Sequence, residues 1–272
     1  MLIAQISDTH LTDSGRNAYG VAPVAENLAR CIQHINQLVP KPDLVLVTGD
    51  ITYSGQLEEV ECAAALLDAL HCPYFIIPGN HDSRESLWSV FGGGSCPSSY
   101  QGFLNYVIEA YPIRLIGLDS TVPGEAGGEI CPARLSWLDT RLSEDTEKPT
   151  IIFMHHPPVK FGVLETDVDG FVGAQSLGDV IEKYGNIKTI LCGHIHLQAH
   201  VAWRGTVIAT APSLGLRLAL DLTLQQPSRF FLDAPGYLLH YWHPEGNLVS
   251  HAVSVANAQG PYLFEEESLQ GV

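Results

Sequence analysis

The run LVLVTGD at residues 44–50 decides the fold, because a short apolar stretch in it ends abruptly on a glycine and a carboxylate. Leu44 to Val47 has the length and the β-branched content of a buried strand. In an α/β sheet, the loops at the carboxyl ends of the strands converge on one rim. The run therefore predicts an α/β fold with Asp50 at a functional rim.

Four further segments with the same placement lie along the chain, each at the end of an apolar run. They are Asp8-Thr9-His10, Gly79-Asn80-His81-Asp82, His155-His156 and Gly193-His194-Ile195-His196. One such segment alone would be weak support for a metal site, because the chain has 12 histidines and short pairs arise by chance. All five in this order indicate ligands for two metal ions.

The apolar pattern between these segments alternates between strand runs and helical spacing, as in an α/β domain. The clearest predicted strands are residues 44–47, 74–77, 151–154 and 187–191. Helical spacing covers residues 24–39, 57–70, 135–142 and 177–184. Beyond residue 196, turns at 203–205 and 244–247 predict antiparallel strand pairs.

The domain organisation expected from this pattern is a catalytic core over residues 1–211. Residues 212–272 form a C-terminal cap and antiparallel strands that complete the core or an oligomer interface. The loops at 92–105, 120–130 and 212–236 carry no readable specificity code, and we place 92–99 and 212–236 near the pocket mouth.

Composition narrows the class of partner and the compartment. The formal net charge is -16 with only 14 Lys and Arg residues, so the surface should repel polyanions, which excludes long nucleic acid as a partner. The six cysteines have no Cys-x-x-Cys spacing, so no disulfide is implied. No leader and no membrane-spanning run is visible, which fits a cytoplasmic enzyme, although a chain trimmed of its leader would look the same.

The residue types of the five segments limit the metal. In extended backbone, residues two apart project to one side, so Asp8 with His10, and likewise His194 with His196, could grip one ion. Oxygen and imidazole donors without thiolate suit Mn, Fe, Co or Zn and leave the choice among them open. Gly49, Gly79 and Gly193 precede ligand positions and should let the backbone bend tightly there.

The five segments together resemble the calcineurin-like metallophosphoesterase superfamily, whose motif pattern is matched without a gap from residue 8 to 196. Gly-Asp-Ile-Thr around Asp50 and the stretch FMHHPP at 153–158 are similar to the class III cyclic-nucleotide phosphodiesterases and bacterial glycerophosphodiesterases. The resemblance implies a four-layer αββα sandwich of two mixed sheets flanked by helices, with a C-terminal β-rich elaboration. It also implies a homo-oligomer, a dimer or larger, with the C-terminal strands as the contact.

The resemblance further implies a ligand set and a mechanism. Asp8, His10 and His196 would bind one divalent ion, Asn80, His155 and His194 the other, and Asp50 would bridge them. A hydroxide shared by the ions would attack a small soluble phosphodiester, a cyclic nucleotide or a glycerophosphodiester. Asp50, Asn80 and His81 are the residues expected to carry the reaction, with His81 binding a phosphoryl oxygen or protonating the leaving alkoxide.

Several alternatives remain open at this point. A phosphomonoesterase on the same site is the second catalytic function, and a non-catalytic scaffold with this fold is the other class. Asp82 is expected to orient its loop, and Tyr53 to form pocket wall or core instead of a metal ligand. His156 is equally well explained as a residue supporting the ligands and as a packed histidine, and His200, His240, His243 and His251 are expected to have sheet positions away from the chemistry.

Overall fold

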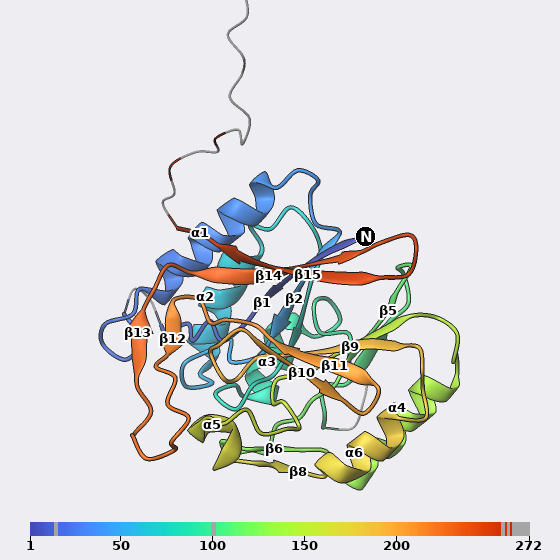
Figure 1. The fold of residues 1–272 in the computed structure, drawn as a ribbon. Coiled ribbons are helices and arrows are strands. Elements are labelled where there is room, and N and C mark those ends of the chain that lie inside the picture. Colours follow the sequence, from blue (N-terminus) through green and yellow to red (C-terminus); the bar gives the residue numbers. More distant parts are fainter. Residues whose placement is uncertain (14–15, 99–101, 257–258, 260–261, 263–272) are drawn as a thin grey trace, which may run out of the picture.

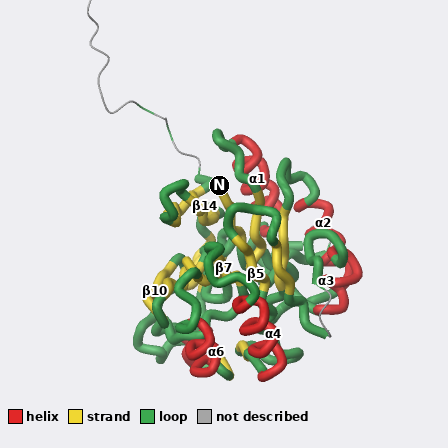
Figure 2. Tube along the Cα trace, turned by 90° about the vertical axis from the view of Figure 1, so that its right-hand side faces the viewer, coloured by secondary structure: helices red, strands yellow, loops and turns green. Residues whose placement is uncertain are grey.

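The computed structural model describes residues 1–13, 16–98, 102–256, 259 and 262, which form two packed mixed sheets with helices outside them (Figures 1 and 2). The first sheet has the strand order β15-β14-β1-β2-β3. Its strands are β1 (Leu2–Ile6), β2 (Leu44–Thr48), β3 (Tyr74–Ile77), β14 (Gly236–Trp242) and β15 (Leu248–Ser254). The second sheet has the order β10-β11-β9-β7-β5-β4. Its strands are β4 (Tyr106–Ile108), β5 (Arg114–Gly117), β7 (Thr150–Phe153), β9 (Ile187–Cys192), β10 (Ala199–Trp203) and β11 (Thr206–Thr210).

The helices lie in two groups on either side of the strands, as Figure 2 shows. One group comprises α1 (Val24–Gln37), α2 (Leu57–Leu67) and α3 (Arg84–Phe91), and the other α4 (Pro132–Ser143) and α6 (Ala174–Ile181). Shorter elements are α5 (Leu164–Asp167) and the paired strands β6 (Gly128–Glu129) and β8 (Phe171–Val172). This arrangement confirms the four-layer fold that the family resemblance implies.

The central strands are parallel, and their burial explains their sequences. β1, β2 and β3 pair in parallel, as do β5, β7, β9 and β11. Every residue of β1, β2, β7 and nearly all of β9 is buried, which is why these strands read as continuous apolar runs without alternation. Because these central strands run the same way within their sheet, the polar segments that follow them meet at one end.

A buried polar bridge aligns the two sheets near that end. The Gln5 amide nitrogen on β1 donates to the Thr48 hydroxyl and to the Cys192 carbonyl, at 3.0 Å in both cases. Gln5 therefore ties β1 to β2 within its own sheet and to β9 of the opposite sheet. This contact places the ends of β1, β2 and β9 at one level.

The predicted elements are confirmed, with boundaries shifted by a few residues. The strands predicted at 44–47, 74–77, 151–154 and 187–191 are β2, β3, β7 and β9, and the four predicted helices are α1, α2, α4 and α6. The predicted turns at 203–205 and 244–247 close the antiparallel pairs β10–β11 and β14–β15. The short helix α3 was not predicted, although Ser83 caps it by accepting a hydrogen bond from the Ser86 amide.

The C-terminal part of the chain has two roles in the fold. β14 pairs antiparallel with β1, so the last strands extend the first sheet. Residues 212–236, which match neither periodicity, form a hairpin of β12 (Leu216–Leu218) and β13 (Phe230–Leu232) that stands beside the main sheets in Figure 1. Among the described residues, no helix has the length and apolar character needed to cross a membrane.

Candidate metal centre

The five polar segments meet at the carboxyl ends of β1, β2, β3, β7 and β9. Two groups of side chains gather there. The first group holds Asp8, His10, Asp50 and His196, whose nearest nitrogen and oxygen atoms all lie within 4.8 Å of one another. His10 Nε2 is 3.0 Å from His196 Nε2, and His196 Nε2 is 3.5 Å from an Asp8 oxygen. This group matches the first predicted ion.

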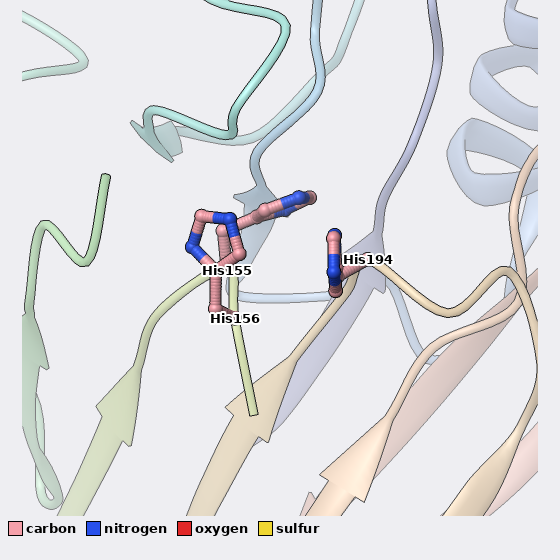
Figure 3. Close-up of side chains that lie close together, drawn as sticks. All are labelled: His155, His156 and His194. Carbon is pink, nitrogen blue, oxygen red and sulfur yellow. The ribbon is translucent and has the colours of Figure 1, made fainter. Parts of the chain in front are cut away.

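The second group holds Asn80, His155 and His194. The Asn80 side-chain oxygen is 3.1 Å from His155 Nε2 and 3.1 Å from His194 Nδ1. Figure 3 shows the rings of His155 and His194 close together at the ends of adjacent strands, with His156 beside them. Its three members are the residues predicted as ligands of the second ion.

Asp50 lies between the two groups. Its Oδ2 is 3.8 Å from His10 Nε2, and its Oδ1 is 3.5 Å from His155 Nε2. The two oxygens therefore face different groups, an arrangement that would allow the carboxylate to bridge two ions. The structure thus brings together all seven side chains predicted as ligands.

The backbone places these side chains in an unexpected way. Five of the eight non-glycine residues with positive φ in the described chain are predicted ligands: Asp8, His10, Asp50, His194 and His196. Left-handed backbone is unfavourable for such residues and is concentrated at functional sites. The extended backbone expected in these two segments is therefore wrong, because both segments turn sharply. The expected pairing holds for Asp8 and His10, which share the first group, and fails for the other pair, since His196 joins the first group and His194 the second.

The glycines before the ligands are required by close packing, and only Gly49 also has the tight bend that was predicted. A Cβ on Gly79 would stand 2.2 Å from Asp50 Oδ1, and one on Gly193 would stand 2.1 Å from Ser7 Oγ. Gly49 has φ +86°, and a Cβ there would lie 2.5 Å from His155 Nδ1. Any side chain at these three positions would displace the residues that form the centre.

Hydrogen bonds on the outer side of the rings set which nitrogen faces inward. His155 Nδ1 donates to the Thr48 carbonyl at 2.8 Å, and His196 Nδ1 donates to the Leu216 carbonyl at 3.0 Å. A carbonyl only accepts, so the proton resides on Nδ1 and the Nε2 lone pair points to the centre. This arrangement is typical of metal-ligating histidine.

The donor spacing fits divalent ions. Donors bound to one ion at about 2.1 Å stand about 3.0 to 3.4 Å apart, depending on the coordination geometry. The distances between His10 and His196 and between Asn80 and each of its two histidines fall in this range. The set contains carboxylate, amide and imidazole donors, so the cluster can hold divalent metal ions whose identity the donors leave open.

Burial and charge prepare the donors for cations. Burial lowers the pKa of His10 well below its usual value, so the ring is neutral and able to ligate. Burial alone would raise the pKa of Asp50, but the neighbouring His155 and His10 lower it well below its usual value. Burial also opposes protonation of His155, yet the Asp50 carboxylate outweighs it and raises the pKa of His155 to about 9. The Asp50 carboxylate therefore stays charged at the centre, and His155 carries a second proton on Nε2 at neutral pH that a bound cation would displace.

His81 is positioned beside the centre by its neighbours. Its Nδ1 donates to the Tyr53 carbonyl at 2.8 Å, its backbone N–H donates to Asp50 Oδ1 at 2.9 Å, and its ring centroid lies 4.7 Å from that of His10. Because Nδ1 carries the proton to the carbonyl, Nε2 is the atom available toward the cavity that His81 lines.

Asp82 orients the loop, as predicted. Its carboxylate accepts from the amides of Ile51, Thr52 and Gly79, at 3.1, 2.8 and 2.9 Å. The side chain thereby clamps the segment after β3 to the segment after β2. These bonds hold His81 and Asp50 in register.

Two other residues singled out in the sequence, His156 and Tyr53, contact protein groups outside the two donor groups. His156 is buried, with Nδ1 2.9 Å from Ser120 Oγ and Nε2 3.2 Å from the Ala126 carbonyl, and burial lowers its pKa well below the usual value. Both nitrogens are thus engaged within the protein. Tyr53 packs edge-on against Tyr19 with ring centroids 5.0 Å apart and belongs to a small apolar cluster, but it does not line the cavity. Of the two positions predicted for it, pocket wall or core, the structure therefore agrees with the core.

A cavity of about 340 Å³ opens over the centre. Its inner end is lined by side chains of the two groups and by His81, and its outer wall by residues that were not predicted from the sequence. These are Tyr19, Ala126, Asp169, Ser228, Arg229 and Phe230, with Leu216 and Leu218.

The loop predictions have mixed outcomes. The hairpin in residues 212–236 borders the cavity as expected, and Ala126 contributes from the 120–130 loop. The pocket-mouth position predicted for 92–99 is wrong for its described residues 92–98, which do not line the cavity; the Ser95 carbonyl instead accepts a hydrogen bond from the Ile76 amide of β3. Residues 99–101 of this loop, and 257–258, 260–261 and 263–272 of the predicted C-terminal cap, lie outside the described part of the chain.

Three of the four C-terminal histidines have the predicted sheet positions, and His243 does not. His240 is buried between Ser250 and Gln5, whereas His200, His243 and His251 lie on β10, on the turn after β14 and on β15. None of them lines the cavity over the centre as the structure describes it.

Comparison with known proteins agrees with this geometry. Residues 1–198 match the family model described as calcineurin-like phosphoesterase. The chain is 38% identical over 273 residues to a probable glycerophosphodiester phosphodiesterase GpdQ of Arcobacter nitrofigilis, covering 98% of each chain. It is 27% identical over 259 residues to the 3',5'-cyclic adenosine monophosphate phosphodiesterase CpdA of Escherichia coli, covering 94% of this chain and 90% of that one.

A solved structure shares the fold at lower identity. A dimetal phosphatase from Danio rerio superposes with a TM-score of 0.66 at 16% identity, covering 94% of this chain and 96% of that chain. At this identity the likeness concerns the fold alone.

Proposed function

The chain belongs to the calcineurin-like phosphoesterase family, and from this premise we propose that it is a binuclear metal-dependent phosphodiesterase that hydrolyses small soluble phosphodiesters. The observation that carries the proposal is Asp50, whose two oxygens face two separate donor groups at the end of one cavity. A donor arrangement with one shared carboxylate suits a pair of ions better than a single structural ion.

The residues proposed to hold the ions follow the two groups. Asp8, His10 and His196 would hold one ion, Asn80, His155 and His194 the other, and Asp50 both. Two divalent ions supply Lewis-acid activation of water and of the phosphoryl oxygens. Manganese, iron, zinc and cobalt all match the donor set.

The chain's own residues would orient the ester. His81 lines the cavity, and when both of its ring nitrogens are protonated, Nε2 can donate a hydrogen bond to a phosphoryl oxygen or a proton to the departing alkoxide. The hydrogen bonds of the His81 ring to Tyr53 and of its amide to Asp50 fix the ring before substrate arrives. Such positioning supplies much of the rate gain in phosphoryl chemistry. Products would be a phosphomonoester and an alcohol.

Among phosphodiesters, we propose glycerophosphodiesters as the first substrate class. The support is the 38% identity, over nearly the whole chain, to the relative named as a probable glycerophosphodiester phosphodiesterase. Cyclic nucleotides are the second class, favoured by the CpdA relative and by the aromatic wall of Tyr19 and Phe230, on which a base could stack.

The experiment loads the protein with Mn²⁺ and compares an aryl phosphodiester with the matching aryl phosphomonoester. We expect faster turnover of the diester than of the monoester. Asn80→Ala and His81→Ala should lose this activity, whereas His200→Ala should retain it. Preference for the monoester would replace the assignment with a phosphomonoesterase, and no turnover of either ester would favour a scaffold. A comparison of the turnover of glycerophosphoethanolamine with that of cyclic AMP then distinguishes the two classes of diester.

The proposal also includes a cytoplasmic location and a homo-oligomer. The hairpin region exposes large apolar side chains, among them Leu222 at 67%, Leu220 at 58% and Phe231 at 53%, and these offer a surface for a second copy. Sedimentation velocity tests this part, since a monomer across the concentration range would contradict it.

A further inference from the structure

Arg229 is unusual among the nine arginines of this acidic chain. The other eight donate to acceptors within the described residues, from Arg16 with Asp13 to Arg217 with Asp233. Within that same part of the chain, the Arg229 guanidinium has no hydrogen-bond or ion-pair partner, and it lines the cavity above the metal centre. An unpaired guanidinium in a cavity is available to a ligand.

The hairpin sets how far Arg229 stands from the metal centre. The inner end of the hairpin touches the centre, because the Leu216 carbonyl accepts from His196 Nδ1. Along β12, Ala219 comes three residues later, and its amide donates to the Arg229 carbonyl. Three strand positions correspond to about 10 Å, so Arg229 stands at the outer half of the cavity.

The reacting phosphoryl group does not need Arg229. It would sit against the two ions and His81 at the inner end, and this end already carries the opposing charge. The outer half is where an alcohol group of a diester would extend, between Arg229 and the Tyr19 and Phe230 rings, whose centroids are 5.3 Å apart. A guanidinium there can pair with a carboxylate or a phosphate in two parallel hydrogen bonds.

We propose that Arg229 binds a second anionic group, a carboxylate or phosphate, carried by the alcohol portion of the diester. Arg229 is then a specificity-determining residue that ranks substrates by the charge of the group beyond the ester. The inference rests on the proposed phosphodiesterase function. Asp169 is the other charged side chain on this outer wall, and its carboxylate would favour an ammonium group on the same alcohol.

The experiment uses the full chain loaded with Mn²⁺ and two substrate pairs. Glycerophosphoserine and glycerophosphoethanolamine differ only by the carboxylate, so any effect of Asp169 on their shared ammonium cancels in the ratio of kcat/KM. Glycerophosphoinositol with and without a 4-phosphate tests the phosphate. The matched variants are Arg229→Gln and Arg217→Gln, the latter an exposed arginine on the same hairpin that pairs with Asp233.

If Arg229 recognises a carboxylate, wild type should have the higher kcat/KM for glycerophosphoserine within the first pair. If it recognises a phosphate, wild type should have the higher kcat/KM for the 4-phosphorylated glycerophosphoinositol within the second pair. Arg229→Gln should lower that preference about 10-fold, the size expected for one lost hydrogen bond between charged groups, and Arg217→Gln should leave it unchanged. Bis(p-nitrophenyl) phosphate, which has no second anion, should be hydrolysed equally by all three proteins.

Other outcomes overturn the proposal. If Arg229→Gln lowers kcat/KM equally for all substrates, the residue acts on the reacting phosphoryl group or on the structure of the hairpin. If the variant loses no kcat/KM for any substrate, Arg229 has no role in substrate binding. Hydrolysis of the aryl diester without any of the four glycerophosphodiesters would overturn the role of Arg229 alone. Absence of all diester turnover would overturn the proposed function itself.

Discussion

His81 is the side chain whose removal should separate chemistry from metal binding. It lines the cavity, while its ring donates to a carbonyl and is not part of either donor group. We expect His81→Ala to lower kcat by about 10²- to 10⁴-fold, as for loss of a positioned proton donor, with the metal content unchanged. Metal analysis and steady-state kinetics on the same preparation check this. A variant that loses bound metal along with activity would show that His81 supports the centre instead.

The close packing of Gly79 against Asp50 leads to a prediction about the substitution Gly79→Ala. A methyl group there would meet the Asp50 amide and Oδ1 at 2.2 Å, and both are backbone or ligand atoms that cannot move without opening the centre. We expect Gly79→Ala to lose metal binding and to lower the free energy of unfolding by about 1 to 3 kcal/mol, the usual cost of overpacking.

Gly185 provides the matched control for this substitution. A Cβ on Gly185 meets nothing within 4 Å, and its φ is not positive, so Gly185→Ala should leave metal binding and stability near wild type. Retention of full metal content in Gly79→Ala would contradict the close approach of Gly79 to Asp50.

The segments that form the centre could be predicted from the sequence because each follows a buried strand, and the family resemblance supplied the assignment of their side chains to two ions. Their backbone conformation could not be predicted. Asp8 and His10 were expected to share an ion through extended geometry, yet both have left-handed φ values, 53° and 46°. Two-residue spacing carries no information on such turns, since tertiary contacts impose them, here the hydrogen bonds from the Asp8 and His10 amides to the Gly49 and Asp50 carbonyls.

At the scale of elements, β14 links the C-terminal strands to the rest of the fold through a buried histidine. His240 Nε2 is 3.0 Å from the Gln5 side-chain oxygen on β1, and its Nδ1 is 2.7 Å from Ser250 Oγ on β15. Gln5 in turn bonds to Thr48 and Cys192, next to the metal centre. The C-terminal pair is therefore part of the first sheet and its buried polar network.

This histidine should make stability depend on pH. Burial, with a smaller contribution from His251, lowers the pKa of His240 to about 4. A histidine whose pKa is about 6.5 when unfolded binds a proton more readily in the unfolded state, so its contribution is present above pH 6.5 and is lost as pH falls toward 4. The loss amounts to about 3 kcal/mol for this shift.

The measurement is denaturant unfolding of metal-free wild type and His240→Gln between pH 7.5 and 4.5. Working without metal removes the pH dependence of ligand binding, and the glutamine keeps polar contacts on this strand. The difference in unfolding free energy between the two proteins should shrink as pH falls. A difference that stays constant over this range would contradict the buried neutral state of His240.

Elements with strong periodicity were predictable, and those set by distant contacts were not. The runs that became β2 and β9 and the stripe that became α1 are long and regular, so local pattern decided them. Helix α3 spans eight residues, and its apolar contacts Leu87 and Phe91 are too few to stand out. The three-residue strands β12 and β13 form because they pair with each other, and no local sequence pattern predicts this pairing.

For the molecule as a whole, the inner end of the site follows from motifs and the outer wall from the fold. The ligand segments lie at strand ends, where the α/β topology brings them together. Tyr19, Arg229 and Phe230 come from parts of the chain more than 200 residues apart, and only the folded hairpin unites them on one cavity. The substrate choice that we propose therefore depends on the C-terminal hairpin together with Tyr19, whereas the proposed chemistry depends on residues at the strand ends.

Metal stoichiometry tests the central claim most directly, because the account depends on two donor groups that share Asp50. Metal-free protein is saturated with Mn²⁺, freed of excess by gel filtration and analysed for metal and protein, with Asn80→Ala alongside. We predict two ions per wild-type chain and one in Asn80→Ala, which retains the Asp8, His10 and His196 group. A saturated wild-type chain that keeps fewer than two ions would contradict the account.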